Sequence, residues 1–191
     1  MNALHADVQA ILDFWFGSDE SARAIWFAKD PHFDAEIARR FGPQVEAALR
    51  GELRDWQDTP ASALARIVLL DQFTRNIYRD TPRAFAGDSL ALAAARTMVS
   101  ARQDEALPPV QRSFVYLPFE HAEDMTAQDE AVRLFAQLGV AAPSLAGYVK
   151  YAQQHRTIIE RFGRFPHRNA VLGRPSSAEE TAFLQQPGSR F

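Results

Sequence analysis

The 191-residue chain contains no cysteine, and only Lys29 and Lys150 are lysines. The absence of cysteine excludes disulfides, thiolate catalysis and cysteine-based zinc sites. The scarcity of lysine means that arginine carries almost all of the basic charge. A genome rich in G and C is a simpler explanation of this bias than selection for anion recognition.

Long apolar runs and secretion signals are also missing. The strongest apolar stretch, residues 67–70, is bounded by Arg66 and Asp71, so no segment could span a bilayer. The N-terminus lacks the basic start and apolar run of a signal peptide. A net charge of −3 provides no general attraction to nucleic acid or to an anionic membrane. We therefore expect a cytoplasmic protein that binds neither; the sequence does not indicate its oligomeric state.

Motifs that bind phosphates, metals or acyl groups are absent as well. The closest glycines are eight residues apart, so there is neither a Walker loop nor a GxGxxG motif. Residues 87–91 form only half of a nucleophile elbow, without a preceding strand. Neither HExxH nor ExxH spacing occurs. We therefore expect no metal site and no cofactor.

Strand signals are nearly absent, whereas helical periodicity recurs throughout the chain. The pattern predicts an all-α fold of about 8–10 helices in one domain over residues 1–191, with a loose tail at 186–191. Helix starts are indicated by Asp30-Pro31 and Thr59-Pro60. The predicted helices cover 5–16, Pro31 to a break at Gly42-Pro43, 45–49, 60–77, 88–102, Pro109 to an interruption at Pro118, a Thr126 cap to Gly139, Pro143 to Phe162, and a short last one after Ser176 or Ser177.

The helix predicted over residues 60–77 carries polar side chains where a buried helix should be apolar. Its apolar positions cover nearly the whole circumference, which indicates burial. Asp71 and Arg75 continue one face at i, i+4 spacing, and Gln72 and Asn76 form a second such pair. Because an unpaired buried charge costs several kcal/mol, partners must lie elsewhere in the chain or in a ligand.

Two further segments are polar for their context. In Glu120-His121-Ala122-Glu123-Asp124, His121 follows Leu117 by four residues and Asp124 follows His121 by three. Both side chains can therefore share a face with core residues. His155 interrupts an apolar stripe, which is typical of a hydrogen-bonded core histidine.

The segment from His155 to Arg174 has five arginines against one acid, whereas residues 120–130 have five acids and neither lysine nor arginine. These segments could satisfy each other in an ion-pair network without any ligand. Alternatively, the Arg75-Asn76 and Arg168-Asn169 pairs, each following a phenylalanine, could meet around one pocket. Their donors would suit a carboxylate or a phosphate.

Several motifs together resemble one family, the uncharacterised bacterial "domain of unknown function 924" group. The resemblance covers residues 10–184 and implies a helical fold similar to tetratricopeptide-repeat proteins, but no activity and no catalytic residues. The chain departs from the family at Thr74, usually proline, and at Ala122, usually serine. The motifs are Phe14-Trp15-Phe16-Gly17, Trp26-Phe27, Leu70-Asp71-Gln72-Phe73-Thr74-Arg75-Asn76, Glu120-His121-Ala122-Glu123-Asp124, Arg161-Phe162-Gly163-Arg164-Phe165-Pro166-His167-Arg168-Asn169 and Leu172-Gly173-Arg174.

Three functional hypotheses follow. The first is a binding domain whose polar pocket holds a small anionic ligand or an acidic peptide. The second is an enzyme that uses the same pocket, with His121 or His167 as general acid or base and Glu123 or Asp124 orienting it. The third is a structural or interaction scaffold, so catalysis stays an open question. The ligand-binding candidates are Asp71, Gln72, Arg75, Asn76, Arg164, Arg168 and Asn169.

Overall fold

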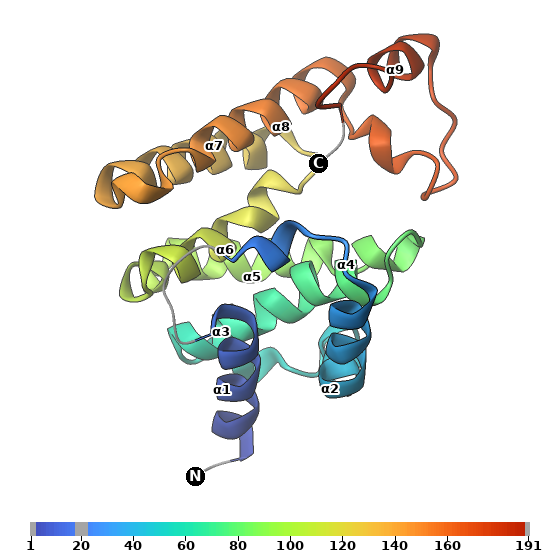
Figure 1. The fold of residues 1–191 in the computed structure, drawn as a ribbon. Coiled ribbons are helices and arrows are strands. Elements are labelled where there is room, and N and C mark those ends of the chain that lie inside the picture. Colours follow the sequence, from blue (N-terminus) through green and yellow to red (C-terminus); the bar gives the residue numbers. More distant parts are fainter. Residues whose placement is uncertain (1–2, 18–22, 190–191) are drawn as a thin grey trace. The chain divides into compact units, whose positions relative to one another are not determined.

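The structure is a computed structural model that describes residues 3–17 and 23–189. Every regular element in these ranges is helical (Figure 1), which confirms the predicted all-α class. The likeness to tetratricopeptide repeats stays a prediction. The α-helices are α1 (Ala3–Phe16), α2 (Pro31–Leu49), α3 (Pro60–Ile67), α4 (Thr74–Ile77), α5 (Asp88–Ser100), α6 (Pro109–Glu120), α7 (Met125–Ala141), α8 (Tyr148–Phe162) and α9 (Ala178–Phe183). Shorter elements are η1 (Ala24–Phe27), η2 (Arg54–Gln57), the π-helix η3 (Val68–Phe73), η4 (Pro82–Phe85), η5 (Gln103–Ala106), η6 (Pro143–Leu145) and η7 (Pro166–Arg168).

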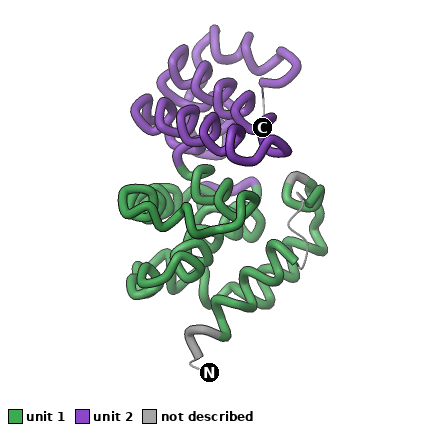
Figure 2. The backbone as a smooth tube through the Cα atoms, turned by 90° about the vertical axis from the view of Figure 1, so that its left-hand side faces the viewer, with its two compact units in different colours: residues 1–79, 83–118 green, residues 80–82, 119–191 purple. Residues whose placement is uncertain are grey.

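The chain divides into two compact units (Figure 2). Unit 1 comprises residues 1–79 and 83–118, and unit 2 comprises residues 80–82 and 119–191. The expectation of a single domain stays a prediction. Within the described ranges, no helix has both the length and the apolar character needed to cross a bilayer.

Three helix starts follow the predicted capping residues. The Asp30 side chain accepts hydrogen bonds from the backbone N–H groups of His32 (2.9 Å) and Phe33 (3.2 Å). Thr59 caps α3 in a capping box, and Ser177 caps α9 in the same way. These side chains satisfy backbone donors that the first helical turn leaves unpaired.

Two predicted interruptions are wrong. Helix α2 runs through Gly42-Pro43, and α6 continues past Pro118 to Glu120. Pro43 is exposed, so the carbonyl that loses its helical hydrogen bond can face water, while the neighbouring Phe41 and Val45 are buried. Packing of the apolar face therefore outweighs the helix-breaking tendency of proline.

Two other helix starts, and the C-terminal tail, differ in detail from the prediction. Asp124, and not Thr126, caps α7, because its side chain accepts from the Ala127 N–H at 2.8 Å. The helix predicted from Pro143 begins as the short η6, and α8 starts at Tyr148. In the predicted tail, Ser189 is buried and its hydroxyl donates to the Leu184 carbonyl at 3.2 Å. Residues 186–188 of the tail are exposed, and residues 190–191 lie outside the described ranges.

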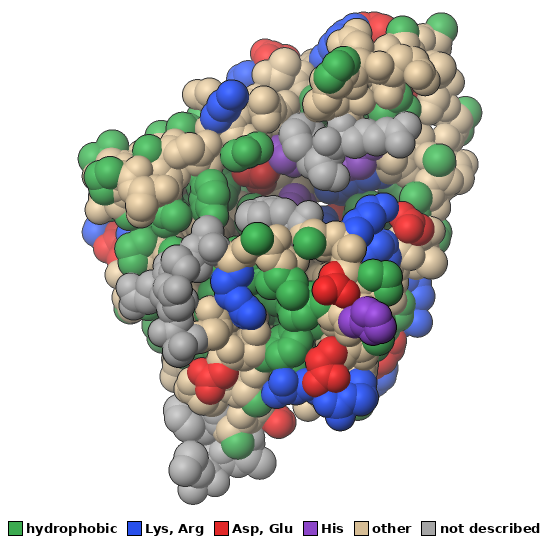
Figure 3. Space-filling view, viewed as in Figure 1, with side chains coloured by type: hydrophobic (Ala, Val, Ile, Leu, Met, Phe, Trp, Pro, Cys, Tyr) green, Lys and Arg blue, Asp and Glu red, His purple; other side chains and the backbone are tan. Residues whose placement is uncertain are grey.

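Each unit has its own apolar core. In unit 1, the fully buried Trp15 stacks on Trp26 and Phe33 and makes edge contacts with Phe73 and Phe114. On the face drawn in Figure 3, acidic and basic side chains lie among apolar ones. In unit 2, α7 packs along α8, and Ile158, Ile159 and Phe165 form a buried cluster.

The predicted buried helix 60–77 is α3, the π-helix η3 and α4 in succession, and its burial is confirmed. The sequence analysis missed the π-helix, where the Thr74 hydroxyl donates to the Leu70 carbonyl at 2.8 Å. A Cβ atom at Gly87 would lie 2.1 Å from that same carbonyl oxygen. Only glycine therefore lets the start of α5 approach the π-helix this closely, which brings Asp88 to Arg75.

Candidate functional site

The first polar group lies in unit 1, at Asp71 and Arg75. Asp71 is fully buried, and its Oδ1 lies 3.2 Å from Arg75 Nη1. Arg75 also donates to both carboxylate oxygens of Asp88, at 2.8 and 3.1 Å. Burial by itself would lower the pKa of Arg75, but the Asp71 and Asp88 carboxylates outweigh it and raise that pKa above its ordinary value. Asp88 is therefore a second carboxylate partner of the half-buried Arg75, and no local pattern in the sequence relates the two residues.

The other two candidates in this segment are also hydrogen-bonded inside unit 1. Gln72 Nε2 donates to Asp71 Oδ2 at 2.5 Å, and Asn76 Nδ2 donates to Asp34 Oδ1 at 2.7 Å. Asp34 in turn accepts two hydrogen bonds from Arg79, at 2.8 and 2.9 Å. The four predicted ligand-binding residues of unit 1 thus stabilise the end of the buried helix.

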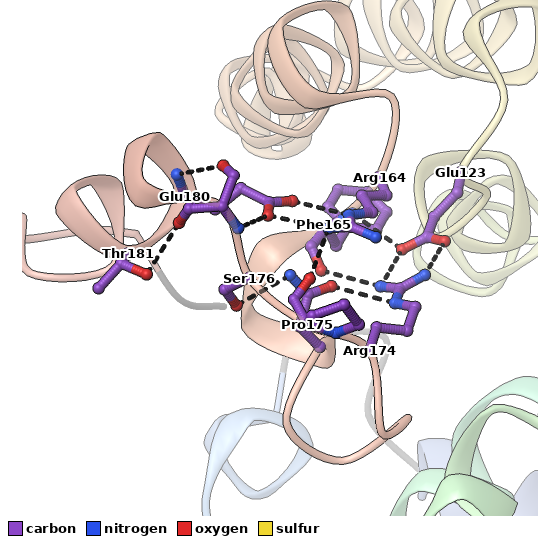
Figure 4. A network of polar contacts seen from close by, with 10 residues as sticks. Glu123, Arg164, Phe165, Arg174, Pro175, Ser176, Glu180 and Thr181 are labelled. Carbon is purple, nitrogen blue, oxygen red and sulfur yellow. Dashed lines mark hydrogen bonds and ion pairs between the residues drawn. The ribbon is translucent and has the colours of Figure 1, made fainter.

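The second polar group lies in unit 2 and is centred on Glu123 (Figure 4). Its carboxylate accepts hydrogen bonds from Arg174 Nη1 (2.6 Å), Arg174 Nη2 (2.9 Å) and the Phe165 backbone N–H (2.8 Å). Burial favours the protonated acid, but these hydrogen bonds outweigh it and lower the pKa of Glu123. Glu123 therefore ties the turn after α6 to the loop after α8.

Arg164 makes a parallel tie to α9 in the same network (Figure 4). Its guanidinium donates to both oxygens of Glu180, at 2.7 and 2.9 Å, and to the Pro175 carbonyl at 2.9 Å. The hydrogen bond from Arg164, joined by one from the Ser177 N–H, lowers the pKa of Glu180 to about 2. Asn169 accepts from Arg174 Nε (3.0 Å) and donates to the Ser176 hydroxyl (3.1 Å).

These contacts correspond to the ion-pair alternative that the sequence left open. Ion pairs join the acidic segment 120–130 to the basic segment 155–174, among them Glu123 with Arg174, and Asp129 with Arg156 at 2.6 Å. Glu180, by contrast, lies outside the acidic segment. Arg164, Asn169 and Glu123 are thus part of the framework of unit 2.

A third group surrounds the fully buried ring of Phe165. The ring of His155 lies 5.5 Å and that of His167 5.6 Å from it, centroid to centroid. The guanidinium carbon of Arg168 lies 4.5 Å from the same centroid, and His121 lies 6.4 Å from His155. We call His121, His155, His167 and Arg168 the imidazole cluster.

His155 is buried and hydrogen-bonded, as predicted for a core histidine. Its Nδ1 lies 2.9 Å from the Tyr151 carbonyl oxygen and 3.2 Å from Glu120 Oε1. Because a carbonyl oxygen can only accept, Nδ1 carries the proton and Nε2 carries the lone pair. Glu120 is the carboxylate placed against an imidazole here, and the sequence analysis did not select it, because nothing local relates it to His155.

Burial also sets the protonation state of the imidazole cluster. Loss of hydration lowers the pKa of His155 to about 3, and the neighbouring His121, His167 and Arg168 act in the same direction. Burial, followed by the charge of Arg168, lowers the pKa of His167 to about 4. Both imidazoles are therefore neutral at pH 7, so each ring can donate through one nitrogen and accept through the other.

The remaining catalytic candidates are distributed as follows. His121 lies half-buried next to the end of α6, and Asp124 caps α7. Both Glu123 oxygens accept hydrogen bonds from Arg174. That all three polar segments line a common pocket stays a prediction, since residues 71–76 belong to unit 1 and the others to unit 2. Within the described ranges, no three His, Asp or Glu side chains are placed to hold a metal ion.

The chain matches a known protein family. The family model described as a bacterial protein of unknown function, DUF924, matches residues 11–188 of the chain. The chain belongs to this family. A solved structure, that of a protein of unknown function from Agrobacterium tumefaciens, is similar to this chain: it is 41% identical, has a TM-score of 0.86, and aligns over 95% of this chain and 98% of that one. A comparison with curated proteins finds no match.

Proposed function

We propose that unit 2 binds a small anionic ligand at the imidazole cluster. The observation that carries this proposal is the gathering of two imidazoles, those of His155 and His167, and the Arg168 guanidinium against the buried ring of Phe165, with a third imidazole, that of His121, next to His155. They come from three separate parts of the chain: the end of α6, α8 and η7. An apolar filling would stabilise such a position without the cost of desolvating polar groups, which favours a role in recognition.

Two other candidate cations form ion pairs: Arg164 is bound to Glu180, and Arg75 is bound to Asp71 and Asp88. Arg168 is buried beside two neutral imidazoles, where an anion would meet both a fixed charge and N–H donors in a partly dry environment.

The test is a titration observed at the imidazole nitrogens by ¹H–¹⁵N NMR. Malonate, citrate and glycerol phosphate serve as probes, and an acidic peptide tests the larger kind of ligand. An anion bound here should raise the pKa of His155 or His167, so a saturable change in their ring ¹⁵N shifts is expected. Arg168→Met should abolish it, whereas Arg133→Met, which removes an exposed cation of α7, should not. No saturable change with any probe would contradict the proposal.

A general acid–base function is the second candidate, because of the geometry at His155. A carboxylate and a carbonyl hold its Nδ1–H, which leaves Nε2 as a neutral base. If this function is correct, His155→Gln should bind the same anion as the wild type but lose turnover, since glutamine cannot exchange a proton. His121→Ala and His167→Ala provide the parallel test for the other two rings. Equal turnover in the wild type and all three variants would exclude this candidate.

A further inference from the structure

Arg66 is a buried cation, and two of its guanidinium nitrogens lack a hydrogen-bond acceptor among the described residues. It lies on α3, where its residue surface is 5% exposed. Its Nε and Nη1 atoms are buried, and no side chain or backbone group in the described parts of the chain accepts a hydrogen bond from either. A guanidinium keeps its charge at any physiological pH, so it cannot adapt to burial by losing a proton.

A second guanidinium lies close by, on η2, which packs against α3. Burial and the positive charge of the exposed Arg54 lower the pKa of Arg66, and Asp55 opposes them only weakly. Arg54 itself folds back beside Gly51, where a Cβ atom would lie 3.6 Å from its Nη2. Two like charges, one on the buried Arg66 and one on the exposed Arg54, thus act on each other here.

Arg75, a half-buried arginine of the same unit, has two carboxylate partners. Asp71 and Asp88 both lie within 3.2 Å of it. A buried charge without such partners costs free energy, and two adjacent like charges add to that cost. An acceptor supplied by a ligand would remove both costs at Arg66.

We propose that Arg66 and Arg54 bind a small oxyanion in unit 1, namely phosphate or the phosphate group of a larger metabolite. A tetrahedral phosphate presents several oxygens, so it can accept from both guanidinium groups at once, with the charge-assisted geometry that arginine favours. The site shares no residue with the imidazole cluster, which belongs to unit 2. It therefore does not depend on the function proposed above.

The test compares the melting temperature of the full chain in sodium phosphate and in sodium chloride at equal ionic strength. For the wild type, about 20 mM phosphate should raise Tm by roughly 3–6 °C over chloride, as expected for a site of about millimolar affinity. Arg66→Met should lose this rise, and Arg54→Ala should reduce it by at least half. Arg39→Ala, which removes an exposed arginine of unit 1 that is paired with Glu36, should keep it.

Two results would overturn the proposal: no rise in the wild type, or the same rise in Arg66→Met as in the wild type. If Arg66→Met does not fold, the surface variant Arg54→Ala decides, and a rise equal to that of the wild type would refute the site. Arg168→Met should keep the rise in Tm. If the rise is lost in Arg168→Met but kept in the Arg66 and Arg54 variants, the phosphate binds at the imidazole cluster instead. A larger rise with glycerol phosphate than with inorganic phosphate would identify a phosphate ester as the better ligand.

Discussion

Arg174 in unit 2 and Arg66 in unit 1 are treated in opposite ways by the fold. All three guanidinium nitrogens of Arg174 donate hydrogen bonds, to Glu123, Asn169 and the Phe165 carbonyl. Arg66 is more deeply buried, yet two of its nitrogens lack any acceptor in the described part of the chain. The arginine-rich loop, which by composition is the better candidate for an anion site, is thus largely a structural tie. Arg66, the single arginine of the apolar helix α3, instead has two guanidinium nitrogens without an acceptor among the described residues.

The largest loss of unfolding free energy should come from removing the ion pair between Arg174 and Glu123. Arg174→Ala leaves the Glu123 carboxylate half-buried without its bidentate partner, so we expect the free energy of unfolding to fall by about 3 kcal/mol. Urea unfolding followed by circular dichroism measures this change. Arg39→Ala removes an equally short but solvent-exposed ion pair, so its loss of stability should be much smaller. Similar losses in the two variants would show that the loop is not held by this pair.

The next effect tests how unit 1 supplies a partner to Arg75. Gly87→Ala places a Cβ atom against the Leu70 carbonyl and must push the start of α5, with Asp88, away from Arg75. We expect a loss of about 2 kcal/mol in unfolding free energy. Gly42→Ala is the matched control, since a Cβ atom there meets nothing within 4 Å and the position is helical. If Gly87→Ala loses no more unfolding free energy than Gly42→Ala, the close approach of α5 to the Leu70 carbonyl does not contribute to stability.

Local signals in the sequence were sufficient to predict several helix starts. They were not sufficient to predict which residues the arginine side chains contact. Asp30, Thr59 and Ser177 cap helices as predicted, because a cap depends only on residues two or three positions away. The break at Pro43 was wrong, since the buried neighbours that carry the helix through it are a tertiary effect. The pairing of Arg75 with Asp88 depends on contacts between elements that no spacing rule encodes. The same is true of the two Arg66 nitrogens that find no acceptor within residues 3–17 and 23–189.

Histidine differs from arginine in that burial can remove its charge, and this makes the stability of unit 2 depend on pH. The pKa of His155 is lowered to about 3 and that of His167 to about 4, from an ordinary value near 6.5. Between these values and pH 6.5 the unfolded chain binds more protons, so stability falls as the pH falls. From pH 7 to pH 5 we expect a loss of about 1–2 kcal/mol for each histidine. Urea midpoints at the two pH values measure it, and His155→Leu should remove about half; an unchanged dependence would contradict burial as its cause.

The smallest expected effect is at Arg66, and its sign sets it apart from the other arginines. In the absence of phosphate, Arg66→Met replaces an unsatisfied buried cation by a flexible apolar side chain of similar length, so we expect the unfolding free energy to stay equal or to rise by about 1 kcal/mol. Arg75→Met is the matched variant in the same unit; it leaves Asp71 and Asp88 without their cation and should lose about 3 kcal/mol. Urea unfolding in chloride buffer measures both. A loss at Arg66 as large as that at Arg75 would show that Arg66 is held by an acceptor within the protein, and the contrast between paired and open arginines would no longer hold.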